Sequence, residues 1–502
     1  AQAVRAPVSW QHWPRRALSG MLSAGSKCAL LLLSILPHTA VAGEYYWPMQ
    51  KGDANRTGYS QYVVTSDLSK PATWRWEDPH SEVIRATPLI DGKKNIYLGT
   101  IGGRIYKFSP DGAIIWTYRS RRGKTPTVSA LMEGSVYLNT AYGFVVALDM
   151  ETGKERWATQ IAREIETDTA CVFAINKTII SAAKWVEKPY QVNHAVIALN
   201  DDGTHRWTFG SQWPLFNFQA SSPGDGTVLF QDQAGGLYRL RLGNGEVLWE
   251  SGIRDRREWF FSTAGGPVLS PNGLVYIASN DHVGGVIHAY RLEDGSPVWR
   301  RDLGMPANQG VAYGVLAGDS RPAVIAGIGE NPSLPWINRL SSYVPQWLRK
   351  LINAASVASA GRPTWLWGTK ELPALVVALE AETGAMRWSY KPPPFTRPSC
   401  EGDEALLFKR YEAQDKFPDF PIDPVCFANN WAQAVIGGDG TAYLGHQDGK
   451  LYAVRDANGN AQIEESEVST HYFAAAFQGP QAIAPGMLAV APCGGGLWVW
   501  RS

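Results

Sequence analysis

The sequence of 502 residues lacks the short patterns that identify several common enzyme classes. It contains no G-x-S-x-G, P-loop, H-E-x-x-H or Cys-x-x-Cys pattern, so hydrolase, NTPase and zinc-site interpretations have no support. The 47 basic and 46 acidic side chains nearly cancel, which leaves no overall field to attract nucleic acid. No apolar run reaches the ~20 residues of a membrane-spanning helix. What the chain has instead is 50 Gly, 32 Pro, 21 Trp and 20 Tyr, a composition typical of aromatic-rich strands joined by many turns.

The first 43 residues contain no Asp or Glu, although four basic residues occur there. An apolar run from Cys28 to Leu36 precedes Ala40-Val41-Ala42, which predicts an export leader over residues 1–43, cleaved after Ala42. Arg15-Arg16 resembles a twin-arginine signal, and the basic, acid-free start also resembles the end of a leader to the thylakoid lumen. We therefore expect an exported protein of the periplasm or extracellular space, or of the thylakoid lumen.

A repeat occupies the rest of the chain. Each copy has a lead strand, an alternating run, a Gly-containing turn, a second run, and a last strand that ends in Trp. These Trp residues are Trp76, Trp116, Trp157, Trp207, Trp249, Trp299 and Trp388. A seventh copy has Ile463 in place of Trp, and an eighth stops at Ser502 before its last strand. Residues 73–76 form a last strand with no copy ahead of them. The prediction is an all-β, eight-bladed β-propeller of four-stranded blades, closed by an N-terminal strand that completes the last blade.

Two stretches, Asp149-METGKERW and Glu380-AETGAMRW, show the form D/E-x-x-T-G-x-x-x-W. This form resembles the tryptophan-docking repeat of pyrroloquinoline quinone (PQQ) proteins, and Trp47-PMQKGDANRTGYS resembles the lead of that superfamily. The likeness covers almost all of residues 44–502. The superfamily contains quinoprotein alcohol dehydrogenases and also non-catalytic propellers such as the assembly factor BamB, so it implies the fold and leaves the chemistry open. In a propeller, each terminal Trp is expected to lie on the next blade, with its N–H bonded to a backbone carbonyl.

For an enzyme, the resemblance implies PQQ in the central funnel, a Ca²⁺ ion, a carboxylate base and a disulfide between adjacent cysteines. The chain has five cysteines, and no two are adjacent. The residues at the starts of lead strands that suit such a site are Asp168 and Glu166 as base or calcium ligand, and Arg85, Asn308, Asn430 and Trp431 as cofactor-binding residues. The same polar residues also suit a channel filled with water, and no metal-ligand set follows from them.

Two insertions depart from the repeat. Residues 329–372 carry apolar side chains at helical spacing with basic residues between them, which predicts a docking surface that includes Trp336, Leu340, Trp347 and Leu351. The same pattern also suits a lid packed over the propeller. Residues 392–431 are rich in Pro and contain Cys400 and Cys426. A disulfide between these two cysteines would close a loop and stabilise the fold by about 3 kcal/mol. Cys171 and Cys493 are expected to be buried thiols.

The residues together predict an exported, PQQ-like propeller that acts as a protein-binding or assembly scaffold. Its partner is expected to be another protein or a membrane interface, bound through residues 329–372, and no cofactor is expected. The alternative is a PQQ- and calcium-dependent oxidoreductase of the quinoprotein alcohol dehydrogenase type.

Overall fold

The computed structural model describes residues 45–125, 129–165, 171–184, 193–215, 217–252, 265–281, 284–331, 345, 347–348, 371–397, 400–403 and 430–502. All of them belong to the second of the two units into which the chain divides, residues 42–502. The predicted leader, Glu166, Asp168, Trp336, Leu340, Leu351 and Cys426 lie outside the described residues. No helix in the described ranges is long and apolar enough to cross a membrane.

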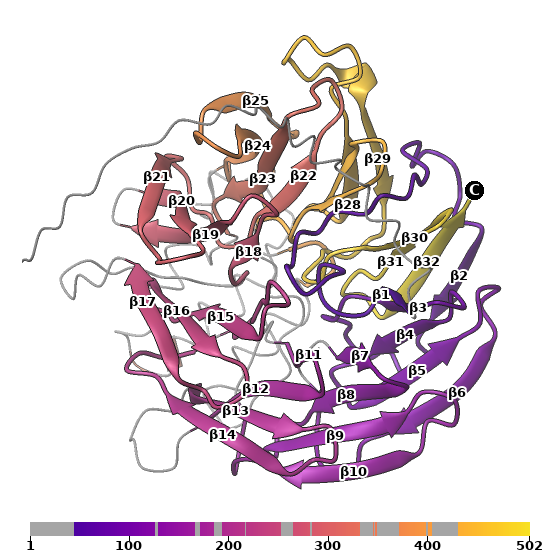
Figure 1. Cartoon of the computed structure of the whole chain (residues 1–502). Coiled ribbons are helices and arrows are strands. Elements are labelled where there is room, and N and C mark those ends of the chain that lie inside the picture. The colour runs from indigo at the N-terminus through magenta and orange to yellow at the C-terminus, as the bar shows by residue number, and fades with distance from the viewer. Residues whose placement is uncertain are drawn as a thin grey trace, which may run out of the picture. The chain divides into compact units, whose positions relative to one another are not determined.

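Eight antiparallel sheets surround a common centre (Figure 1), which confirms the predicted propeller. Blade 1 contains β3 (Leu89–Asp91), β4 (Ile96–Gly99), β5 (Arg104–Phe108) and β6 (Ile114–Arg119), and blade 2 contains β7 (Ala130–Met132), β8 (Ser135–Asn139), β9 (Phe144–Asp149) and β10 (Glu155–Gln160). Blade 3 contains β11 (Phe173–Ile175), β12 (Thr178–Lys184), β13 (Asn193–Asn200) and β14 (His205–Gly210). Blade 4 contains β15 (Thr227–Gln231), β16 (Gly236–Arg241) and β17 (Val247–Gly252). In blade 4 the inner strand is reduced to a bridge between Ser221 and Leu229.

Blades 5 to 8 complete the ring. Blade 5 contains β18 (Val268–Leu269), β19 (Leu274–Asp281), β20 (Gly284–Arg291) and β21 (Pro297–Asp302), and blade 6 contains β22 (Ala312–Val315), β23 (Pro322–Gly329), β24 (Ala374–Glu380) and β25 (Met386–Tyr390). Blade 7 contains β26 (Val435–Ile436), β27 (Ala442–Gly445), β28 (Lys450–Val454) and β29 (Val468–Tyr472), with the short 3₁₀ helix η3 (Glu465–Glu467). Blade 8 contains β30 (Ala482–Ala484), β31 (Met487–Val490), β32 (Gly496–Arg501) and β2 (Trp74–Glu77).

The ring closes as the sequence predicts. The N-terminal strand β2 pairs with the C-terminal strand β32, with Arg75 opposite Trp498 and Trp76 opposite Leu497. The register corrects one assignment, because Trp74 and not Trp76 donates its indole N–H to the next blade, at the carbonyl of Pro110. Trp76 packs on Tyr106 instead, with ring centroids 4.7 Å apart. Alternate residues of a strand share a face, so the spacing alone could not choose between the two indoles.

The indoles at the ends of the outer strands contact the following blade. Their Nε1 atoms donate to backbone carbonyls at 2.8–3.0 Å: Trp116 to Met150, Trp157 to Asp201, Trp207 to Leu242, Trp249 to Leu292 and Trp299 to Ala381. Each ring lies against a glycine with positive φ in the turn that follows, namely Gly153, Gly203, Gly245, Gly295 and Gly384. The Trp of each of these blades therefore packs against the Thr-Gly, Asp-Gly or Asn-Gly turn of the next blade.

The interior of each sheet is buried on both faces, and the outer strands are partly exposed. All five residues of β5 and β8 are buried, whereas β6 exposes four of its six residues. Side chains of neighbouring blades share one core, as where Val136 and Leu148 of blade 2 pack with Leu89 and Ile105 of blade 1. Burial between blades is therefore what holds the ring together.

A segment near the N-terminus crosses one end of the ring. Strand β1 (Tyr45–Trp47) adds to the inner strand β3 of blade 1. The carbonyls of the following residues, here called the plug segment (residues 48–60), accept backbone bonds from five other blades. These bonds are Leu131 N–H to Pro48, Ser222 to Ala54, Leu269 to Asn55, Tyr313 to Thr57 and Ile436 to Gly58. The plug segment thus fastens the inner strands of blades 2, 4, 5, 6 and 7 to one another.

The cysteines differ in part from expectation. Cys171 is a buried thiol, as predicted, but Cys493 is in a disulfide bond. Cys400 is a buried thiol, so the expected disulfide with Cys426 is wrong. Cys400 lies in a buried cluster with Ala476 and Cys493. Loop length estimates the entropy of a disulfide, but not the separation of the two Cβ atoms that decides whether it forms.

Candidate functional site

The inner strands bring polar side chains to the middle of the channel. Gln219 lies two residues before Ser221, the inner-strand residue of blade 4 that pairs with β15. Gln433 has the same position in blade 7, two residues before Val435 of β26. Gln433 Nε2 donates to Gln219 Oε1 at 3.2 Å, so side chains from blades 4 and 7 meet across the channel. Both side chains are buried. The channel is therefore closed at this level by an amide bridge.

Two cations of the plug segment reach the same level. Arg56 Nη2 donates to Gln219 Oε1 and, at 3.3 Å, to the carbonyl of Gly265. Lys51 Nζ donates to the carbonyl of Val311. Blade 6 presents only backbone here, because a Cβ on Gly310 would lie 2.7 Å from the Cα of Gly265. Lys51 is thus bound by a backbone carbonyl, and Arg56 by an amide oxygen and a backbone carbonyl, with the Cys171 thiol and Asp53 close enough to affect its charge.

Burial governs the electrostatics of this centre. It lowers the pKa of Lys51 well below its usual value, and the neighbouring Arg56 lowers it further. Burial also raises the pKa of the Cys171 thiol to about 11, against the opposing effect of Arg56. Cys171 Sγ donates to Gln50 Oε1 of the plug segment. A thiol held in this way is protonated at neutral pH and is a poor nucleophile.

Three of the sequence-predicted residues lie together at the other end of the inner strands. Asn308, Asn430 and Trp431 line one crevice between blades 6 and 7, together with Pro306, Gln309, Gly327 and Gly329. The crevice contains about 140 Å³ of empty space and is too narrow to hold a water molecule. The fourth predicted residue, Arg85, lies elsewhere, at the junction of blades 1 and 8, where its carbonyl approaches Gly479. The structure therefore brings three of the four candidates together.

The asparagines of the crevice belong to a chain of amides. Asn280 Nδ2 donates to Asn308 Oδ1 at 2.6 Å, and Asn308 Nδ2 donates to Asn331 Oδ1 at 3.0 Å. Asn331 Oδ1 also accepts the backbone N–H of Asn430 at 2.9 Å, and Asn430 Nδ2 donates to the carbonyl of Glu330. This chain joins blades 5, 6 and 7 at the point where the insertion after β23 begins. The chain thus ties Glu330 and Asn331, which precede the insertion, to the neighbouring blades.

Trp431 is a packing residue in this arrangement. It is only 1% exposed, and a Cβ on Gly327 would lie 2.3 Å from its Cγ. Its ring centroid is 4.2 Å from that of His446 and 5.3 Å from that of Tyr452. The ring is therefore enclosed between blades 6 and 7.

These residues do not fit a quinone as they are placed. A crevice too narrow for water cannot admit a tricyclic cofactor, and the indole offers no uncovered face for stacking. No three His, Cys, Asp or Glu side chains gather into a metal-binding group within the described ranges. We derive no redox step from this crevice.

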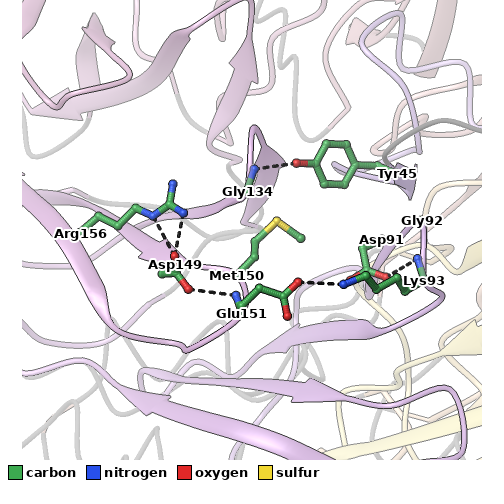
Figure 2. A pocket seen from close by; sticks show the side chains of 9 residues that line it. All are labelled: Tyr45, Asp91, Gly92, Lys93, Gly134, Asp149, Met150, Glu151 and Arg156. Carbon is green, nitrogen blue, oxygen red and sulfur yellow. Dashed lines mark hydrogen bonds and ion pairs between the residues drawn. The ribbon is translucent and has the colours of Figure 1, made fainter.

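A larger cavity, which sequence reasoning missed, lies between blades 1 and 2 (Figure 2). It has a volume of about 400 Å³ and is lined by Tyr45, Asp91, Gly92, Lys93, Gly134, Asp149, Met150, Glu151 and Arg156. Its charges pair with one another, Arg156 with Asp149 at 2.7 Å and Lys93 with Glu151 at 3.2 Å. The Arg156 guanidinium lowers the pKa of Asp149 to about 2. The sequence feature that could have indicated this cavity is the Asp149-METG turn, because most of the charged residues that line the cavity belong to that turn or contact it.

One residue of the predicted docking surface is described. Trp347 is 65% exposed, in a helical turn where Leu348 N–H donates to the carbonyl of Pro345. Both ends of the insertion are fixed to the sheet, because Glu330 N–H bonds the carbonyl of Pro373 and Leu372 N–H bonds that of Phe395. The insertion thus leaves and re-enters blade 6 at one anchored point.

Comparison with known proteins agrees with the fold. A family model described as outer membrane protein assembly factor BamB matches residues 101–326. A putative dehydrogenase XoxF of Paracoccus denitrificans is 28% identical over 189 residues, which is 34% of this chain and 31% of that protein. The match therefore spans about a third of that relative's length.

Three solved structures share the architecture. BamB from Moraxella catarrhalis has a TM-score of 0.55 at 14% identity, over 88% of this chain and 100% of that one. A europium-containing methanol dehydrogenase has a TM-score of 0.58 at 12% identity, over 89% and 90%. The quinohemoprotein alcohol dehydrogenase of Comamonas testosteroni has a TM-score of 0.58 at 12% identity, over 92% and 81%. At these identities the likeness concerns the fold alone.

The fold defines the protein as an eight-bladed β-propeller whose blades are linked by indoles and closed by an N-terminal strand. More particularly, residues 101–326 match the family model of the assembly factor BamB, and the fold of the chain is the one that BamB and the quinoprotein dehydrogenases share.

Proposed function

We propose that the protein is an exported scaffold that binds another protein through the insertion of blade 6. The observation that carries the proposal is the exposure of Trp347, which at 65% is the most exposed large hydrophobic side chain among the described residues. Indoles are among the residues that most often dominate the binding energy of protein interfaces. An exposed indole that a helical turn holds in place suits the role of an anchor in a partner's pocket.

The anchoring of the insertion supports the same proposal. The amide chain through Asn308, Asn331 and Asn430 fixes its base to three blades. A surface fixed at its base loses less conformational entropy on binding than a free loop does. The propeller then serves as a rigid support for a recognition element.

The test is site-specific photo-crosslinking in the cells that produce the protein, followed by binding measurements on the isolated partner. A photoreactive side chain at position 347 is expected to give one discrete adduct. The same probe at Tyr142, which is 61% exposed on the hairpin between β8 and β9, is the matched control. With the purified partner, Trp347→Ala should weaken binding at least tenfold, as for an interface hot spot, and Tyr142→Ala should not.

Two outcomes would contradict the scaffold proposal. If neither position gives an adduct and the Trp347 variant loses binding to anionic vesicles instead, the insertion binds a membrane. If the protein retains PQQ with Ca²⁺ after desalting and oxidises an alcohol with a dye as acceptor, the oxidoreductase alternative replaces the scaffold. The crevice at Asn308, Asn430 and Trp431 does not support that second outcome, because it does not fit the cofactor.

A further inference from the structure

The closed middle of the channel contains two buried cations and too little negative charge to balance them. Lys51 is 0% exposed and Arg56 is 1% exposed. Asp53 is the carboxylate that acts on both. Its own oxygens accept the backbone N–H and the hydroxyl of Thr57, at 3.0 and 2.5 Å. With Lys51 protonated, two positive charges and one negative charge leave a net charge of +1 on the plug segment.

Hydrogen-bond donors at this centre also lack acceptors. Arg56 Nε is buried and has no partner, and the same holds for the hydroxyl of Thr87. Thr87 occupies in blade 1 the place that Gln219 occupies in blade 4, two residues before the one that pairs with the second strand. Lys51 Nζ carries three N–H groups and donates to one carbonyl. The free donors of the plug segment itself therefore belong to its two cations.

A buried charge without a partner is costly, and a protein removes it either by losing the proton or by binding a counter-ion. Arg56 cannot lose its proton at any physiological pH. The neighbouring amides of Gln219 and Gln433 give dipoles but no charge. Spare donors around an uncompensated positive charge are the features of an anion site.

We propose that the closed middle of the channel binds one monovalent anion, chloride or a small carboxylate, between Lys51 and Arg56. The anion neutralises the plug segment and accepts hydrogen bonds from Arg56 Nε and from the N–H groups of Lys51 Nζ that have no other acceptor. It is held where the plug segment meets the inner strands, so it stabilises the closure of the channel. This proposal does not depend on the scaffold function, because Lys51 and Arg56 belong to the plug segment and not to the insertion or to the amide chain at its base.

The first test is the thermal stability of the whole chain against chloride concentration, with the ionic strength held constant by a bulky sulfonate. Wild type should show a saturable rise in Tm of about 1–3 °C, the size expected when a ligand reaches ~10–100 times its dissociation constant. Lys51→Met should abolish the rise. It should also be at least as stable as wild type without chloride, because it removes a buried charge and keeps most of the side-chain volume.

The matched control is Lys107, a second buried lysine whose Nζ contacts the carbonyl of Met150 at 2.8 Å and a carboxylate oxygen of Glu151 at 3.4 Å. Lys107→Met should lower the Tm and leave the chloride response intact. A wild-type Tm that does not depend on chloride would overturn the proposal and mean that Lys51 is buried uncharged. An equal chloride response in Lys51→Met would overturn it as well.

The second test locates the ion and distinguishes its sources. Crystals grown in bromide should give an anomalous peak in contact with Lys51 Nζ and Arg56 Nε. Titrations with formate and acetate in place of chloride show which class binds more tightly, and the halide and the carboxylate should compete. A bromide peak only at exposed lysines would contradict the site even if the protein is stabilised by salt. Trp347→Ala should show the wild-type chloride response, so a failure of the scaffold proposal is distinguishable from a failure of this one.

Discussion

Each docking indole packs against a glycine of the next blade, and substitution of Gly245 allows the contribution of this contact to stability to be measured. Gly245 has φ +72°, and a Cβ added there would lie 2.8 Å from Cδ2 and Cε3 of Trp207. Trp207 is 5% exposed and donates its Nε1 hydrogen to the carbonyl of Leu242 at 2.8 Å. Gly245→Ala must therefore both strain the backbone and displace the indole.

The structure allows the two costs to be separated. An L-residue in the left-handed region costs about 1 kcal/mol. Displacing the indole adds lost packing and a weakened hydrogen bond, about 1–2 kcal/mol more. Gly226 has φ +81° with nothing within 4 Å of an added Cβ, so Gly226→Ala should show the strain alone. Gly243 also has nothing within 4 Å, and no positive φ is recorded for it, so Gly243→Ala should be nearly neutral.

The assay is urea-induced unfolding of the three single variants, with m-values compared to verify that one transition is measured. The expected order of destabilisation is Gly245→Ala, then Gly226→Ala, then Gly243→Ala. In a double-mutant cycle, Trp207→Ala should reduce the cost of Gly245→Ala, because the clashing ring is gone. If Gly245→Ala costs no more than Gly226→Ala, or if the cycle shows no coupling, the glycine is not a seat for the indole.

Three further changes have predicted directions. Trp74→Phe should cost about 1 kcal/mol of unfolding free energy in a urea titration, because it removes the N–H bond between blade 8 and blade 1 while retaining most of the ring. Asp149→Asn should cost about 1 kcal/mol or less at pH 7, since Arg156 and Asp149 are both partly exposed. Because the folded pKa of Asp149 is about 2, below its unfolded value, this difference should disappear as the pH falls from about 4 to 2. Burial and Arg56 lower the folded pKa of Lys51, so the unfolded chain binds more protons, and wild type should gain stability over Lys51→Met as the pH rises towards 10 in chloride-free buffer.

The repeat made the fold predictable from local patterns. Each blade contains its own turn signals and alternation, and the incomplete last copy identified the strand that closes the ring. The error of two residues between Trp76 and Trp74 shows the limit, since both indoles suit the same face of β2 and only the pairing with β32 fixes the register.

The candidate site was less predictable because its contacts join residues far apart in the sequence. Gln219 and Gln433 are separated by 214 positions, and Arg56 reaches a blade that begins more than 160 residues later. The lead of residues 47–60 could be recognised by resemblance, but nothing local indicated that Lys51 and Arg56 point into the channel. Asn308, Asn430 and Trp431 do lie together, apart from Arg85, but the repeat could not show how closely the blades would pack around them.

The two ends of the inner strands in blades 6 and 7 contact different parts of the chain, the base of the insertion at one end and the plug segment at the other. In blade 7 the inner strand runs from Asn430, beside the base of the insertion, to Ile436, which bonds the plug segment at Gly58. In blade 6 it runs from Asn308 in the amide chain to Tyr313, which bonds the plug segment at Thr57. If the insertion binds a partner as proposed, changes there should leave the plug segment in place, because several residues of paired or buried strand separate the two. An ion at Lys51 and Arg56 would strengthen the fixed end, on which the geometry of the variable end depends.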